Sequence, residues 1–189
     1  MPIETLYDKD YYKNCLGPIP CSWESEEWSG FVKNVANNIK QKYNPNSIID
    51  AGCGIGLLVG AFKDLGVSWA IGFDDSEYAI KEARKHLGTW AVKRNLTSTL
   101  PGQAELVTCI EVLEHISKEH ASLCISNLCS MAEKFIVFSS SPDDLEEPTH
   151  VNVQPESYWL NLFSTYNFEK IDSAPYISPQ AIVLQRVKV

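Results

Sequence analysis

The sequence predicts an α/β fold: a doubly wound, mostly parallel seven-stranded sheet with helices on both faces and a C-terminal antiparallel hairpin. Three observations support this prediction. Short β-branched runs alternate with segments of helical periodicity over residues 47–140. A glycine-rich turn joins the first of these runs to a helix. Residues 168–173 and 181–187 alternate weakly between apolar and polar side chains, as the two strands of a closing hairpin do.

The first strand, turn and helix occupy residues 47–65. Ile48 and Ile49 are β-branched and lie in a run too short for a helix, so they predict a buried strand. Gly52, Gly54 and Gly56 follow at alternate positions and allow a sharp turn with close approach to a ligand. A helix beginning directly afterwards offers unpaired N–H groups and a partial positive charge. This arrangement is typical of a nucleotide-binding loop.

The other elements are expected to alternate in the same way. Ser22 or Ser25 is expected to cap a helix from about residue 24 to 43, with an apolar stripe that includes Phe31 and Ile39. Ser76 is expected to cap a second helix. The further strands are expected at 67–75, 89–93, 104–110 and 133–139, and the further helices at 77–87, from about 114 to about 131, and from Pro155.

Composition limits the function classes. The 189 residues carry a net charge of −8, which disfavours broad binding to a nucleic-acid backbone. No apolar run approaches the ~20 residues of a membrane span, and residues 1–5 lack a signal core, so we expect a cytoplasmic protein with no membrane partner. The six cysteines lack zinc-like spacing. We expect one domain (1–45 lid and helix, 46–189 core) that is a monomer or homodimer.

Asp50 ends the first strand, directly before the glycine turn. A pyrophosphate would gain little from a carboxylate there, whereas an amino-acid ammonium would gain a charge-assisted hydrogen bond. This favours S-adenosylmethionine (SAM) over NAD, with an ordinary strand–turn–helix or a dinucleotide fold as the alternative. Residues 50–56, Asp-Ala-Gly-Cys-Gly-Ile-Gly, resemble the first motif of the class I SAM-dependent methyltransferases. The resemblance covers residues 47–140.

The resemblance also implies cofactor contacts beyond the turn. Asp74 ends the second strand, where a carboxylate can accept both ribose hydroxyls, unless Asp74 and Asp75 serve only as helix N-terminal charges. Residues 7–12 resemble the aromatic lid of small methyltransferases, with a pinned surface arm as the alternative. Relatives often place Asp and an apolar residue beside adenine, where this chain has Asn95 and Leu96. The expected cofactor set is Asp50, Gly52, Cys53, Gly54, Gly56, Asp74, Asp75, Asn95, Leu96, Ile110, Glu111 and Tyr12.

The candidate chemistry lies at Glu111, Glu114, His115 and His150. Glu111 follows the fourth strand, and Glu114 and His115 come one short turn later, so the three side chains can converge. His150 follows the fifth strand, which is expected to be adjacent. Two carboxylates and two imidazoles can form an open site for a divalent cation such as Mg²⁺. Without a metal, His115 or His150 is the expected general base, and Glu111 remains a catalytic candidate.

The same Glu-x-x-Glu-His element resembles that of the small-RNA terminal 2′-O-methyltransferases and the ubiquinone-pathway O-methyltransferases. In many other methyltransferases of this class the stretch binds no metal. The resemblance implies O-methylation of a small hydroxylated acceptor, such as a metabolite or a sugar. The alternatives are 2′-O-methylation of a terminal RNA ribose and a non-catalytic SAM-binding partner of a larger methyltransferase.

Overall fold

The computed structural model describes residues 6–98 and 102–187, which form two compact units, Met1–Asn95 and Leu96–Val189. The expected fold class is confirmed: the chain forms a seven-stranded, mostly parallel sheet that ends in antiparallel strands. Within the described ranges, no helix is both long enough and apolar enough to cross a membrane.

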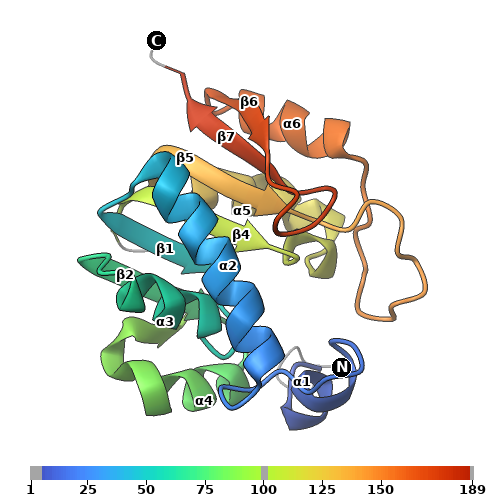
Figure 1. The fold of residues 1–189 in the computed structure, drawn as a ribbon. Coiled ribbons are helices and arrows are strands. Elements are labelled where there is room, and N and C mark those ends of the chain that lie inside the picture. The colour runs from blue at the N-terminus through green and yellow to red at the C-terminus, as the bar shows by residue number, and fades with distance from the viewer. Residues whose placement is uncertain (1–5, 99–101, 188–189) are drawn as a thin grey trace. The chain divides into compact units, whose positions relative to one another are not determined.

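The first unit is built on three parallel strands in the order β3-β2-β1 (Figure 1). Asp50 of β1 lies opposite Gly72 of β2, so the two strands end at the same edge. The helices α2 and α3 pack against each other, and α4 packs on β2 and β3. The elements in order are α1 (Lys9–Asn14), α2 (Glu26–Tyr43), β1 (Ser47–Ala51), α3 (Leu57–Asp64), β2 (Trp69–Asp74), α4 (Glu77–Leu87), a 3₁₀ turn (Gly88–Trp90) and β3 (Ala91–Lys93).

Local capping explains where the helices of the first unit begin. The Ser25 hydroxyl accepts a hydrogen bond from the Trp28 backbone N–H at 3.3 Å, so Ser25 rather than Ser22 caps α2. The Ser76 hydroxyl caps α4 in the same way, as the sequence predicts. The expected apolar stripe of α2 is wrong at Phe31, which is 41% exposed.

The second unit begins with the parallel pair β4 and β5 and closes with two antiparallel strands. β7 pairs with β5 on one side and β6 on the other, so the last strand of the chain lies between two earlier ones. α5 packs on β4 and β5 and against α6 (Figure 1). The elements are β4 (Ala104–Ile110), a 3₁₀ helix (Leu113–His115), α5 (Lys118–Met131), β5 (Ala132–Ser139), α6 (Glu156–Ser164), β6 (Phe168–Ser173) and β7 (Ile182–Arg186).

Aromatic packing fixes α6 on this unit. The Phe138 ring of β5 meets the rings of Trp159 and Phe163 edge-on, with centroids 5.6 and 5.1 Å apart. Both α6 side chains are almost completely buried. Pairs in this geometry contribute roughly 0.5–1.5 kcal/mol beyond their buried area.

Two elements differ from the sequence prediction. The helix expected to begin at about Glu114 begins later, because Leu113–His115 form a separate 3₁₀ helix and Ile116 is extended, so α5 begins only at Lys118. The third strand begins at Ala91 because Gly88–Trp90 form a 3₁₀ turn first. The first difference matters most, because it separates the Glu114–His115 pair from the long helix.

Candidate functional site

The glycine-rich turn of the first unit depends on backbone conformations that other residues avoid. Gly52, Gly54 and Gly56 have φ values of 80°, 52° and 84°. The backbone N–H of Gly52 donates to the Phe73 carbonyl at 2.7 Å, which ties the turn to β2. A Cβ on Gly56 would lie 2.6 Å from Leu87 Cδ1. The turn therefore requires glycine both for its conformation and for its packing.

Asp50, Cys53 and Asp74 lie together at this turn. Asp74 Oδ2 accepts a hydrogen bond from the Gly54 N–H and Oδ1 accepts one from the Ser76 N–H, each at 2.8 Å. Burial raises the pKa of Asp74, and these two hydrogen bonds oppose that shift. Burial, Asp74 and Asp50 together raise the pKa of the Cys53 thiol. Both carboxylates therefore act on the same buried thiol beside the glycines.

The aromatic segment near the N-terminus packs on the turn. Tyr12 of α1 is 8% exposed, and a Cβ built on Gly54 would lie 3.2 Å from its hydroxyl. The Ser76 hydroxyl donates to the Tyr7 carbonyl at 2.6 Å, which fixes the start of the segment. The segment thus lies where a lid over the turn would lie, and its contact with a cofactor remains a prediction.

The remaining predicted cofactor residues lie in both units. Asn95 Nδ2 donates to Asp75 Oδ2 at 2.7 Å, which joins the end of β3 to the end of β2. Leu96 is 6% exposed and begins the second unit. Ile110 is the last residue of β4, directly before Glu111.

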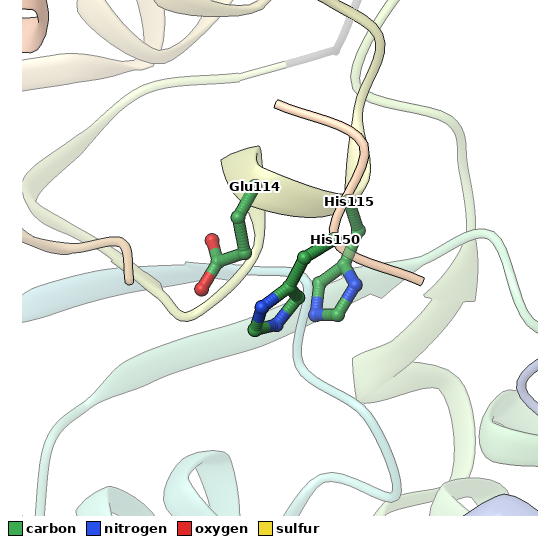
Figure 2. Close-up of side chains that lie close together, drawn as sticks. All are labelled: Glu114, His115 and His150. Carbon is green, nitrogen blue, oxygen red and sulfur yellow. The ribbon is translucent and has the colours of Figure 1, made fainter. Parts of the chain in front are cut away.

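The second unit brings three of the four predicted metal ligands together. Glu114 and His115 lie on the 3₁₀ helix after β4, and His150 reaches them from the loop after β5 (Figure 2). A ligand atom from each lies within 4.8 Å of the others. The backbone N–H of Val151 donates to the Glu114 carbonyl at 2.8 Å, and this hydrogen bond ties the His150 loop to the 3₁₀ helix.

The hydrogen bonds around the two imidazoles fix their tautomers. His115 Nδ1 lies 3.3 Å from the Thr149 carbonyl oxygen, and His150 Nδ1 lies 2.9 Å from the Asp144 carbonyl oxygen. A carbonyl oxygen can only accept, so each neutral ring carries its proton on Nδ1. Nε2 then holds the lone pair in both rings. Metal-binding histidines are oriented by hydrogen bonds of this kind.

Glu114 supplies an oxygen to the same cluster. Its side chain is completely buried, its Oε1 accepts a hydrogen bond from the Ser141 N–H at 3.1 Å, and its carboxyl group is hydrogen-bonded to that of Glu111. Burial and the neighbouring Glu111 raise the pKa of Glu114 to about 8. Burial and the neighbouring His150 lower the pKa of His115 to about 4. A divalent cation would bind the Glu114 carboxylate and the Nε2 lone pairs of the two imidazoles.

Glu111 lies outside the three-residue cluster. Its backbone N–H donates to the carbonyl and the hydroxyl of Ser139, at 3.0 and 3.2 Å. Its Oε1 accepts a hydrogen bond from Gln180 Nε2 at 3.2 Å. Three of the four predicted side chains therefore come together in one group. Glu111 lies beside it, hydrogen-bonded to Glu114 and to Gln180.

Comparison with known proteins decides the family. A family model described as "Methyltransferase domain" matches residues 22–173. The chain belongs to this methyltransferase family. The magnesium-protoporphyrin O-methyltransferase of Synechocystis sp. is 31% identical over 105 residues, which are 52% of this chain and 45% of that relative. The ubiquinone biosynthesis O-methyltransferase of Thiobacillus denitrificans is 39% identical over 77 residues, which are 36% of this chain and 33% of that relative. The matches span less than half the length of these two relatives.

Solved structures support the methyltransferase fold. The magnesium protoporphyrin IX methyltransferase of Synechocystis, crystallised with bound SAH, superposes with a TM-score of 0.65 at 21% identity, covering 95% of this chain and 98% of that one. An amino pentose methyltransferase from Micromonospora echinaspora, crystallised with SAM, gives a TM-score of 0.67 at 10% identity, covering 85% and 92%. These likenesses show the shared fold.

Sequence reasoning missed the residues that contact Glu111 and the cluster of Glu114, His115 and His150. Thr149 and Asp144 orient the imidazoles through backbone carbonyls, which carry no sequence signal. Ser141 acts through its backbone N–H in the same way. Gln180 acts through its side chain, but nothing in its local sequence connects it to Glu111.

Proposed function

We propose that this chain is a SAM-dependent O-methyltransferase whose residues Glu114, His115 and His150 bind a divalent cation that holds a small hydroxylated acceptor. One observation carries the proposal: ligand atoms of a buried carboxylate and two imidazoles lie within 4.8 Å of one another, and backbone carbonyls beside both Nδ1 atoms leave the lone pair of each ring on Nε2. The names of the two curated relatives support oxygen as the methylated atom.

The first unit holds the cofactor in this proposal. Asp50 binds the ammonium of the methionine part, and Tyr12 lies over the turn. Asp74 accepts hydrogen bonds from the ribose hydroxyls, because a carboxylate has about four lone-pair sites and the Gly54 and Ser76 N–H groups occupy one site on each oxygen. SAM supplies an electrophilic methyl group. The glycine turn lets the backbone approach it closely.

The second unit binds the acceptor. A divalent cation on this cluster would orient a hydroxyl and lower its pKa. The Thr149 and Asp144 carbonyls orient the two imidazoles and leave the Nε2 lone pairs for the ion, and Ser141 fixes one oxygen of Glu114. Catalysis then consists mainly of aligning the acceptor oxygen with the methyl group.

The charge of the loop before His150 favours a small acceptor over RNA. Residues 142–150 carry four carboxylates, Asp143, Asp144, Glu146 and Glu147, and the first three are exposed. A phosphate backbone approaching this loop would be repelled. RNA methylation is therefore the second candidate, and the same assay tests it.

Binding measurements test the two sites separately. By titration calorimetry, SAM and SAH bind the wild type, NAD does not, and Asp74→Asn weakens SAM by about 10-fold or more through lost charge-assisted hydrogen bonds to ribose. Mn²⁺ binds the wild type, and Glu114→Gln and His150→Ala each weaken it by about 10-fold or more. Glu119→Gln, on the exposed face of α5, is the matched control. Tight NAD binding without SAM binding would overturn the methyltransferase reading.

Turnover distinguishes the remaining functions. With methyl-labelled SAM and pools of hydroxylated metabolites, label passes to a small molecule only with the divalent ion present. Label in RNA would support the second candidate, and SAM binding without any transfer would support a non-catalytic partner. Full activity in chelator that is lost in His150→Ala would assign His150 as a base and overturn the metal site.

A further inference from the structure

Gln180 and Glu111 form a polar contact in the second unit that the proposed function does not use. The amide Nε2 of Gln180 donates to Glu111 Oε1 at 3.2 Å, across 69 residues of sequence. A carboxylate can only accept, so the amide nitrogen rather than the amide oxygen must face it. The contact joins the β6–β7 loop to the residue that follows β4.

Sheet pairing explains why the two residues meet. β5 is paired on one side with β4 and on the other with β7, through Ile110↔Ser139 and Phe138↔Ile182. The residue after β4 and the residues just before β7 therefore both lie at the end of β5. The β6–β7 loop is closed by a hydrogen bond from the Ala174 N–H to the Ala181 carbonyl at 2.7 Å, so Gln180 projects from a tied loop.

The Glu111 backbone is also constrained. Its φ of 52° is uncommon for a residue with a Cβ, and strained residues of this kind cluster at functional sites. Two hydrogen bonds from its N–H to Ser139 hold that conformation. Ser139 thus fixes the backbone of Glu111, and Gln180 is hydrogen-bonded to its carboxylate. Gln180 is not one of the three residues of the cluster.

We propose that Gln180 is a positioning residue that holds the Glu111 carboxylate out of the ion's coordination shell. The inference rests on the proposed metal function. Glu111 contacts Glu114 but lies outside the group formed by Glu114, His115 and His150. The protein then supplies three ligands, and the remaining coordination positions stay open for acceptor oxygens, as in catalytic metal sites.

Mn²⁺ alone tests this without knowledge of the acceptor. Gln180→Ala releases Glu111, which becomes a fourth ligand, so the affinity for Mn²⁺ rises by about fivefold or more as ligand charge increases. The number of waters on the bound Mn²⁺, measured by proton relaxation, falls by about one in the same variant, since the carboxylate replaces a water. A purely structural role for Gln180 would leave the affinity unchanged or lower it.

A double-mutant cycle identifies the group responsible. In the Glu111→Gln background, Gln180→Ala produces neither the gain in affinity nor the loss of water, because the fourth ligand is absent. Gln185→Ala removes an exposed glutamine of β7 and serves as the matched control. A gain that persists in the Glu111→Gln background, or an unchanged or lower affinity in Gln180→Ala, overturns the proposal while leaving the metal site intact. If the wild type fails to bind Mn²⁺, both proposals fall.

Discussion

The buried carboxyl of Glu114 should make the metal-free protein less stable as the pH rises from 6.5 to 8. The folded-state pKa of Glu114 is raised to about 8, whereas an unfolded glutamate has a pKa of about 4.3. In this window the folded protein retains a proton that the unfolded chain has lost. The free energy of unfolding therefore falls as the pH rises. The stability contributed by the proton on Glu114 is lost as the pH passes through the folded-state pKa.

The size of the effect follows from the same pKa values. Each pH unit in the window changes the free energy of unfolding by up to about 1.4 kcal/mol, so 1.5 units give at most about 2 kcal/mol. For a chain of this length, that corresponds to roughly 4–8 °C in melting temperature. His115 acts at lower pH: its folded pKa of about 4 makes stability rise between pH 4 and 6.5, so the two effects occupy different windows.

Denaturant unfolding in chelator at several pH values measures this slope. Glu114→Gln removes the titrating carboxyl and keeps a side chain of nearly the same shape. Between pH 6.5 and 8, the free energy of unfolding of this variant should therefore fall by up to about 2 kcal/mol less than that of the wild type. Glu119→Gln should follow the wild type, because the Glu119 side chain is 77% exposed. Parallel curves for the wild type and Glu114→Gln between pH 6.5 and 8 would refute the reasoning.

Three further predictions concern packing and reactivity. Gly72→Ala should cost about 1–3 kcal/mol in denaturant unfolding, because its Cβ would lie 2.6 Å from Cys53 Sγ, and an unchanged midpoint would contradict this. Phe163→Ala, which empties a fully buried position, should cost about 3–5 kcal/mol in the same assay, and a cost below about 1 kcal/mol would show that the site collapses or is not buried. In native thiol labelling at pH 8, followed by mass spectrometry, the exposed Cys15 should react well before Cys129, since burial raises the pKa of the Cys129 thiol to about 12, and equal rates would count against the burial described.

The sequence determined the features that depend on near neighbours along the chain. The spacing of Gly52, Gly54 and Gly56 after a β-branched run was sufficient for the strand, the turn and the helix, because each follows from residue preferences and periodicity within a few positions. The caps at Ser25 and Ser76 follow for the same reason. The exposure of Phe31 could not be predicted from near neighbours, because helical periodicity does not show how wide a face of α2 the rest of the protein buries.

Only the tertiary structure decided which polar groups meet. Glu111, Glu114 and His115 look equivalent along the sequence, yet only Glu114 and His115 join His150 in one cluster, whereas Glu111 adopts a left-handed φ and is hydrogen-bonded to Gln180. His150 joins the cluster through backbone hydrogen bonds from its loop to the Glu114 carbonyl, and Gln180 reaches Glu111 because β7 pairs with β5. Contacts between residues this far apart depend on strand register and loop closure, which local side-chain patterns do not encode.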